Sequence, residues 1–218
     1  MLRSITIALF TVTGAAIAAP LHNSAEQVDT GPTISDNPIR PWMRQKGLLT
    51  DEQEALYLTG ADTSRYTSAI AWAPLVAWNW VTKGTLNVGN VPAYSGDMII
   101  DHRSTLIIGS HKTVKNWWAN VPGSEPCGKK MCETFGFYTF PCSTPPTVTF
   151  TFGGHQFPIS PEDFSLGPTD DGGTKCFGAI IGSENVPEDA WVIGEKFMKS
   201  TYTVFDRSNS RVGFAVPV

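Results

Sequence analysis

The sequence predicts an all-β protein with a few short helices, and three observations carry this prediction. Residues 147–152 alternate polar and apolar side chains with the period of a β-strand, and Gly153-Gly154 then provides a hairpin turn. Residues 68–100 contain several further β-rich runs separated by turn-forming residues. In the second half of the chain, one segment has the periodicity of an amphipathic helix, residues 110–120.

The first eighteen residues have the pattern of a secretory signal peptide. Arg3 gives a positively charged start, residues 5–17 are apolar, and Ala16 and Ala18 frame a small-x-small cleavage site. No later apolar run reaches the roughly 20 residues that a membrane-spanning helix needs. We therefore expect a mature chain that begins at Ala19, is secreted into solution and has no membrane partner.

The chain after the signal peptide divides into an arm and one domain. Residues 19–35 are polar and rich in turn-forming residues, which predicts a flexible N-terminal arm. A single folded domain is expected over residues 36–218, beginning with a short helix at residues 36–47.

The first half of this domain is expected to form an antiparallel meander. Its strands are predicted at residues 68–75, 78–82, 85–88 and 97–100, with a turn at Lys83-Gly84. The helix at residues 110–120 follows. Ser110 can cap its N-terminus, and one face carries three apolar side chains that we assign to the core, Val114, Trp117 and Trp118.

The composition is that of a globular protein, with 41% hydrophobic and 17% charged residues. The formal net charge of -4 gives no reason to expect nucleic acid or an anionic membrane as a partner. The four histidines have no metal-ligand spacing, so we expect neither a metal site nor a cofactor. Four cysteines in an exported chain predict two disulfides, for which three pairings are possible.

The segment most indicative of a functional site is residues 97–109. An apolar strand at residues 98–100 leads into Asp101, and a second apolar run at residues 106–108 follows it. This pattern is typical of a carboxylate presented at the end of a buried strand. A structural alternative is an Asp101 that pairs with the neighbouring Arg103 in a simple salt bridge.

The same segment resembles the second active-site segment of pepsin-like aspartic peptidases. That family has an apolar pair followed by Asp-Thr-Gly, two hydroxyl residues, Leu, two apolar residues and Gly. This chain has His102-Arg103 in place of Thr-Gly and otherwise keeps the pattern at Asp101, Ser104, Thr105, Leu106 and Gly109.

Further segments extend the resemblance from residue 48 to residue 214. Residues 56–67, the corner at residues 161–164 and the closing residues 190–215 are similar to family segments. Gly194 stands where a strand of the family crosses beside the catalytic loop and leaves no room for a side chain. The resemblance implies a single pepsin-like β-barrel lobe, the C-terminal lobe of a secreted, fungal-type enzyme, with the N-terminal lobe missing.

We also assign the disulfides at this point. Cys127 is paired with Cys132, which closes a tight loop. Cys142 is paired with Cys176, which closes a long excursion and matches the C-terminal disulfide of the family.

The resemblance implies acid peptide-bond hydrolysis by two carboxylates, one from each lobe, that activate a water molecule. This chain supplies one of them, Asp101, with Ser104 and Thr105 expected to line the cleft. His102 cannot reproduce the hydrogen bonds of the family's Thr, and Arg103 places a bulky cation where the family's Gly lets the backbone N–H approach the carboxylate. We therefore expect the lobe to be inactive alone.

Three interpretations remain open from the sequence. The lobe is a non-catalytic module that binds a peptide or protein. Alternatively, it becomes an active endopeptidase by homodimerisation or by complementation with a separate N-terminal lobe. The third interpretation is a truncated product with no independent role.

Overall fold

The computed structural model describes residues 61–128, 132, 135–170 and 173–218. The expected signal peptide, the N-terminal arm and the helix at residues 36–47 lie outside the described residues, as do residues 48–60 of the family resemblance. The expected lobe is therefore described from residue 61 onward.

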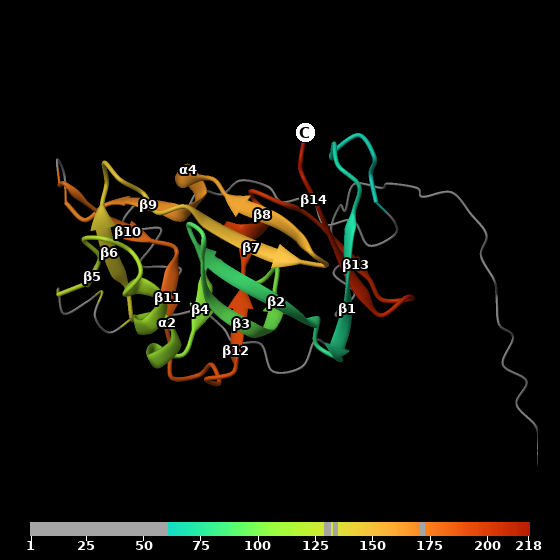
Figure 1. Ribbon diagram of the computed structural model, residues 1–218, viewed down its shortest axis with the longest axis horizontal. Helices are drawn as coiled ribbons and strands as arrows, with labels where there is room; N and C mark the ends of the chain where they lie inside the picture. Colours follow the sequence, from blue (N-terminus) through green and yellow to red (C-terminus); the bar gives the residue numbers. More distant parts are fainter. Residues whose placement is uncertain (1–60, 129–131, 133–134, 171–172) are drawn as a thin grey trace, which may run out of the picture.

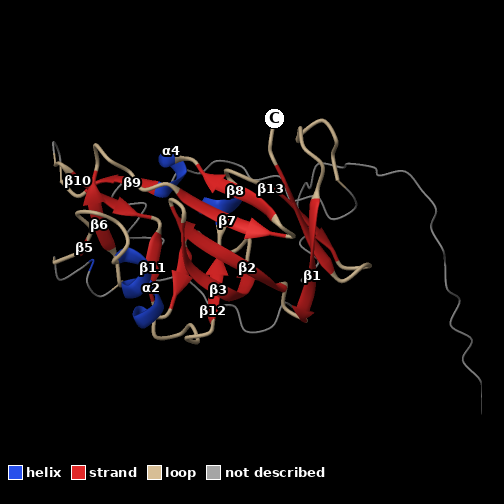
Figure 2. Ribbon diagram, in the orientation of Figure 1, coloured by secondary structure: helices blue, strands red, loops and turns tan. Residues whose placement is uncertain are grey.

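The described chain is built mainly of strands, as the sequence predicts (Figures 1 and 2). In chain order the elements are β1 (Ala71–Ala77), β2 (Val81–Val88), β3 (Val91–Ile100), β4 (Ile107–Gly109), α2 (His111–Trp118), β5 (Glu125–Pro126), β6 (Tyr138–Pro141), β7 (Val148–Phe152), β8 (His155–Ile159), α4 (Pro161–Phe164), β9 (Ser165–Pro168), β10 (Lys175–Gly178), β11 (Ile180–Gly182), β12 (Ala190–Ile193), α5 (Glu195–Met198), β13 (Tyr202–Asp206) and β14 (Arg211–Ala215).

These strands form two sheets. The larger has the strand order β11-β4-β12-β3-β2-β1-β14-β13, with the β7–β8 hairpin attached to β2. The smaller has the order β5-β6-β10-β9. In Figure 1 the small sheet lies at one end of the molecule, and β1 with β13 and β14 lies at the other. Strands from the two ends of the described chain thus meet, because β1 pairs with β14.

The predicted meander is present, but its turns differ from the prediction. Lys83 and Gly84 lie inside β2, which pairs with β3 along its whole length, and the turn instead occupies residues 78–80. A Cβ at Gly84 would lie 2.6 Å from the Phe152 ring and 2.7 Å from the Met98 sulfur. Gly84 therefore allows close packing across the sheet. The sequence pattern alone had instead indicated a chain reversal at this glycine.

The predicted helix is confirmed as α2. The Ser110 hydroxyl caps it by accepting a hydrogen bond of 3.2 Å from the Thr113 N–H. Val114, Trp117 and Trp118 are all buried, and the Trp118 indole N–H donates to the Ile180 carbonyl at 3.1 Å. The helix thus anchors β11 next to β4.

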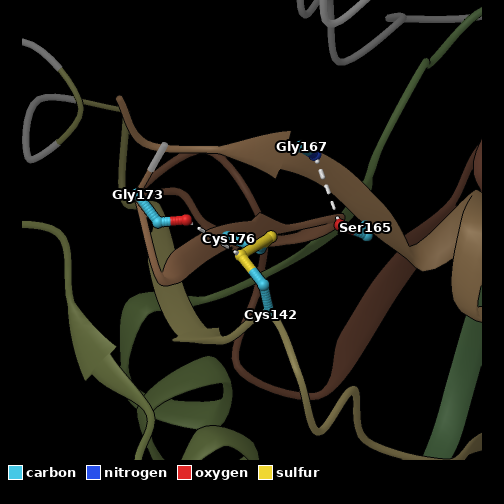
Figure 3. Close-up of a disulfide and its surroundings, with 5 residues drawn as sticks. All are labelled: Cys142, Ser165, Gly167, Gly173 and Cys176. Atoms are coloured by element: carbon cyan, nitrogen blue, oxygen red, sulfur yellow. Dashed lines mark hydrogen bonds between the residues drawn. A yellow bond between two sulfur atoms is a disulfide. The ribbon is translucent and has the colours of Figure 1, made fainter. Parts of the chain in front are cut away.

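Both disulfides have the expected partners. Cys127 is bonded to Cys132, and Cys142 is bonded to Cys176. Figure 3 shows the second bond, which joins the segment after β6 to β10; the Cys142 sulfur also lies 3.9 Å from the Gly173 carbonyl oxygen. This bond therefore ties the end of β6 to β10, the two middle strands of the small sheet, far along the chain from Asp101.

Candidate active site

The candidate site is positioned by a strand crossing. β12 lies between β3 and β4, parallel to β3 and antiparallel to β4. The loop from β3 to β4 must therefore pass over the end of β12, and Asp101 is its first residue. The Asp101 N–H donates to the Ile193 carbonyl at 3.0 Å, which fixes the start of the loop on the last residue of β12.

Gly194 has the role that the sequence predicts. A Cβ at this position would overlap the carbonyl oxygens of Ser104 and Leu106. The same Ser104 carbonyl accepts a hydrogen bond of 2.8 Å from the Glu195 N–H, and the Thr105 carbonyl accepts one of 3.1 Å from the Lys196 N–H. The start of α5 is therefore fastened directly to the loop that carries Asp101.

The Asp101 carboxylate is half-buried and held on both oxygens. Its Oδ1 accepts from the Arg103 backbone N–H at 3.0 Å, and its Oδ2 accepts from the Ser104 hydroxyl at 2.8 Å. The Ser104 N–H donates to the Asp101 carbonyl at 3.2 Å and closes the turn. In the described part of the chain, no hydrogen bond joins this carboxylate to another carboxyl group.

Arg103 does not behave as the sequence indicated. The alternative of a salt bridge to Asp101 is not seen among the described residues: the side chain of Arg103 is exposed, and its backbone N–H binds the carboxylate. The expectation that a side chain here would hinder the approach of the N–H is also wrong. The turn needs no left-handed residue at this position, so an arginine fits and points outward.

Ser104 and Thr105 are adjacent to Asp101 as expected, but both side chains are buried. Ser104 is 0% exposed and Thr105 is 1% exposed. The two carbonyl groups that bind the start of α5 hold this segment inside the fold. Ser104 therefore contributes by orienting the carboxylate, and neither residue presents its side chain at the surface of the described lobe.

His102 occupies the position where the sequence departs from the family. Its ring is half-buried and lies 5.9 Å from the Phe205 ring in an edge-on arrangement. Burial lowers the pKa of His102 and Arg103 acts in the same direction, whereas the Asp101 carboxylate opposes them. The environment therefore favours a neutral imidazole beside the carboxylate.

An aromatic surface that the sequence did not predict adjoins this loop. The Trp80 carbonyl accepts from the Ile100 N–H at 3.1 Å, and the Trp80 ring lies 4.9 Å from Phe205. Arg207 lies over the rings of Trp78 and Trp80. The sequence signal for this surface is a pair of tryptophans around a single residue, Trp78-Asn79-Trp80. The sequence pattern had predicted a strand there.

Neither a candidate metal site nor a candidate membrane-spanning helix is found among the described residues. No group of three or more His, Cys, Asp and Glu side chains there is arranged to hold a metal ion. Within the same residues, no helix has both the length and the apolar character that crossing a membrane requires.

Comparisons with known proteins agree with this geometry. A profile described as "Eukaryotic aspartyl protease" matches residues 46–217. The chain is 35% identical over 180 residues to "Aspartic protease" of Phaffia rhodozyma, covering 78% of this chain and 42% of that protein. It is 31% identical over 160 residues to Penicillopepsin-3 of Penicillium janthinellum, covering 71% and 39%. Pepsin A of Sus scrofa is 31% identical over 176 residues, covering 76% and 43%. The chain thus spans about two fifths of the length of these curated relatives.

Proposed function

This chain belongs to the eukaryotic aspartyl protease family, and we propose that it is a secreted peptide-binding lobe whose aspartate does not hydrolyse peptide bonds by itself. One observation carries the proposal: in the described chain, no second carboxyl group is bonded to the Asp101 carboxylate, whose two oxygens accept from the Arg103 N–H and the Ser104 hydroxyl. The peptide class of ligand follows from the family.

The chemistry explains why one carboxylate favours binding over hydrolysis. Two close carboxyl groups share one proton, so that one activates water as a base while the other serves as an acid. A single carboxylate that already accepts two hydrogen bonds can still accept a third from a peptide N–H. Among the described residues, no second carboxyl group is bonded to it that could protonate the departing amine, so we expect a bound peptide to stay intact.

The neighbours of Asp101 support the same proposal. His102 fills the space beside the carboxylate and packs on Phe205, where its half-buried ring favours the neutral form. Arg103 adds an exposed cation next to the loop. Together they give Asp101 an environment suited to holding a ligand in place. This environment differs from that of two acids that share a proton.

Secretion is part of the proposal. The first eighteen residues have the pattern of a signal peptide, and two disulfides are consistent with an oxidising compartment. One relative, 29% identical over 164 residues, is named Secreted aspartyl protease 1 of Malassezia globosa. Export of this chain can be tested directly by its recovery from the medium with the signal peptide removed.

A second candidate function is an endopeptidase formed by pairing, either of two copies or of this lobe with a separate N-terminal lobe. The observation that favours it is the pair of hydrogen bonds that Asp101 accepts from the Arg103 N–H and the Ser104 hydroxyl. These bonds keep the carboxylate in an ordered position. Among the described strands, β13 is also the last in the order of the large sheet, and a terminal strand is where a second chain can add to a sheet.

One experiment separates the two functions. The full chain is secreted so that both disulfides form, and binding of short apolar peptides is measured by tryptophan fluorescence next to cleavage of an acid-unfolded protein. We expect peptide binding that Asp101→Asn weakens, without cleavage by either form. The matched control is Asp189→Asn, an exposed aspartate just before β12. Cleavage that disappears in Asp101→Asn but persists in Asp189→Asn would establish pairing and overturn the non-catalytic proposal.

A further inference from the structure

An aromatic surface with one arginine lies beside the candidate site. We call it the Trp78–Arg207 surface, and it consists of Trp78, Trp80, Phe205 and Arg207. The guanidinium carbon of Arg207 lies 4.1 Å from the centre of the Trp78 ring and 5.3 Å from that of Trp80. Trp80 in turn meets Phe205 at 4.9 Å. Two hairpin turns, after β1 and after β13, thus join in one surface.

This surface is continuous with the Asp101 loop. The Ile100 N–H donates to the Trp80 carbonyl at 3.1 Å, one residue before Asp101. On the other side, Phe205 packs against His102, one residue after Asp101. A peptide that reaches Asp101 with its backbone can therefore place a side chain on the Trp78–Arg207 surface.

Two properties of this surface are unusual for a purely structural cluster. Trp78 is 76% exposed, which leaves a large apolar ring in water. Trp80 has a φ of 55°, in the left-handed region that bulky residues avoid. Strained residues of this kind concentrate at functional sites, where the surrounding structure holds them.

The positive charge of Arg207 indicates the kind of ligand that this surface would bind. Arg207 donates from Nη1 to the Trp78 carbonyl at 2.9 Å, and in the described part of the chain it forms no ion pair. Arg211 on the same hairpin provides the contrast. It also stacks on a tryptophan, Trp72 at 3.8 Å, but its Nε donates to the Asp206 carboxylate at 2.8 Å.

A guanidinium is planar and has its N–H donors in one plane, and this geometry matches a carboxylate. We propose that Arg207 binds the carboxylate of an acidic residue in the peptide, while the rings of Trp78 and Trp80 pack against an apolar neighbour. The inference rests on the proposed peptide binding and adds a preference to it: peptides with an acidic residue on this side of Asp101.

The test uses pairs of peptides that differ in one charge. Apolar octapeptides carry a single Glu at each position in turn, and each has a twin with Gln at that position. Affinities are measured with the full secreted chain. At one position we expect the Glu peptide to bind about tenfold more tightly than its Gln twin, as a charge-assisted hydrogen bond implies.

Three variants test whether Arg207 is the source of the preference for Glu peptides. Arg207→Gln should lose the preference, so that it binds each Glu peptide no more tightly than its Gln twin. Arg207→Lys keeps the charge and should retain part of the preference. Arg211→Gln removes one positive charge and one stacked arginine from the same hairpin and should keep all of it.

The outcomes separate this inference from the proposed function. Equal binding of Glu and Gln peptides by the unmodified chain overturns the acidic preference and leaves peptide binding intact. A failure of every peptide to bind overturns both. If Arg207→Gln and Arg207→Lys both unfold more easily and weaken Glu and Gln peptides alike, Arg207 is a structural clamp between two turns and the inference is wrong.

Discussion

The backbone N–H of Arg103 lies 3.0 Å from Oδ1 of Asp101, although arginine replaces the glycine of the family at this position. The turn that brings the N–H to the carboxylate is closed by the Ser104 N–H and the Asp101 carbonyl at 3.2 Å. The geometry of the acid therefore depends on the backbone of the turn, and the side chain at position 103 is left at the surface.

Replacing Ser104, which binds the other oxygen of Asp101, should lower the free energy of unfolding. Ser104→Ala removes the 2.8 Å hydrogen bond to Oδ2 of Asp101 from a fully buried position. Hydrogen bonds to charged groups of this kind contribute about 1.5–3 kcal/mol. We expect a loss of that size in the free energy of unfolding measured with urea. Ser208→Ala, at an exposed turn position, is the control and should change stability little; equal stabilities of the two variants would contradict the assigned role.

The strand crossing makes a stronger prediction for Gly194. Gly194→Ala places a Cβ against the carbonyl oxygens of Ser104 and Leu106, and the Ser104 carbonyl also binds the start of α5, so it cannot move independently. We expect a loss above about 3 kcal/mol or failure to fold. Gly128→Ala is the matched control, since a Cβ there meets nothing within 4 Å. Recovery of soluble Gly194→Ala with unchanged urea midpoint would refute the overlap.

The sequence predicted the fold class and the position of Asp101 because those depend on local patterns. Alternation identified β7 and β8 around Gly153-Gly154, and the helix signals identified α2 with its Ser110 cap. The crossing glycine was also predicted, since a family resemblance carries the pattern of close backbone approach.

The features that the sequence did not predict depend on contacts between residues far apart in the chain. Lys83-Gly84 has the local signal of a turn, yet Gly84 lies within β2 because the Phe152 and Met98 side chains need its space. The Trp78–Arg207 surface joins residues 129 positions apart, and the local sequence carries no sign of that pairing. Similarly, the outward direction of Arg103 follows from the turn and not from the residue type.

The two disulfides should differ in their contribution to stability. Cys142 and Cys176 are separated by 34 residues, whereas Cys127 and Cys132 are separated by 5. A longer closed loop removes more entropy from the unfolded chain, so the larger bond should contribute about 4 kcal/mol and the smaller about 2. The double variants Cys142→Ala with Cys176→Ala, and Cys127→Ala with Cys132→Ala, test this by thermal unfolding. A larger loss from the second pair would contradict the loop-length argument.

His102 gives the protein a pH dependence whose sign follows from its surroundings. Burial lowers the pKa of this imidazole from an ordinary value of 6.5, so the unfolded chain takes up the proton at a higher pH than the folded lobe does. The stability that neutral His102 contributes is therefore complete above the unfolded pKa. It is lost as the pH falls from that value through the lower pKa of the folded state.

His102→Gln removes this titration and should make the lobe lose less stability on acidification than the unmodified chain loses. Urea unfolding at about pH 7.5 and about pH 5 measures both changes, and the comparison cancels the carboxylates that titrate in the two forms alike. His155→Gln alters an exposed imidazole on β8 and is the matched control. If His102→Gln and the unmodified chain lose the same stability between the two pH values, the half-buried ring on Phe205 does not resist protonation, and the neutral imidazole assigned to the Asp101 loop is wrong.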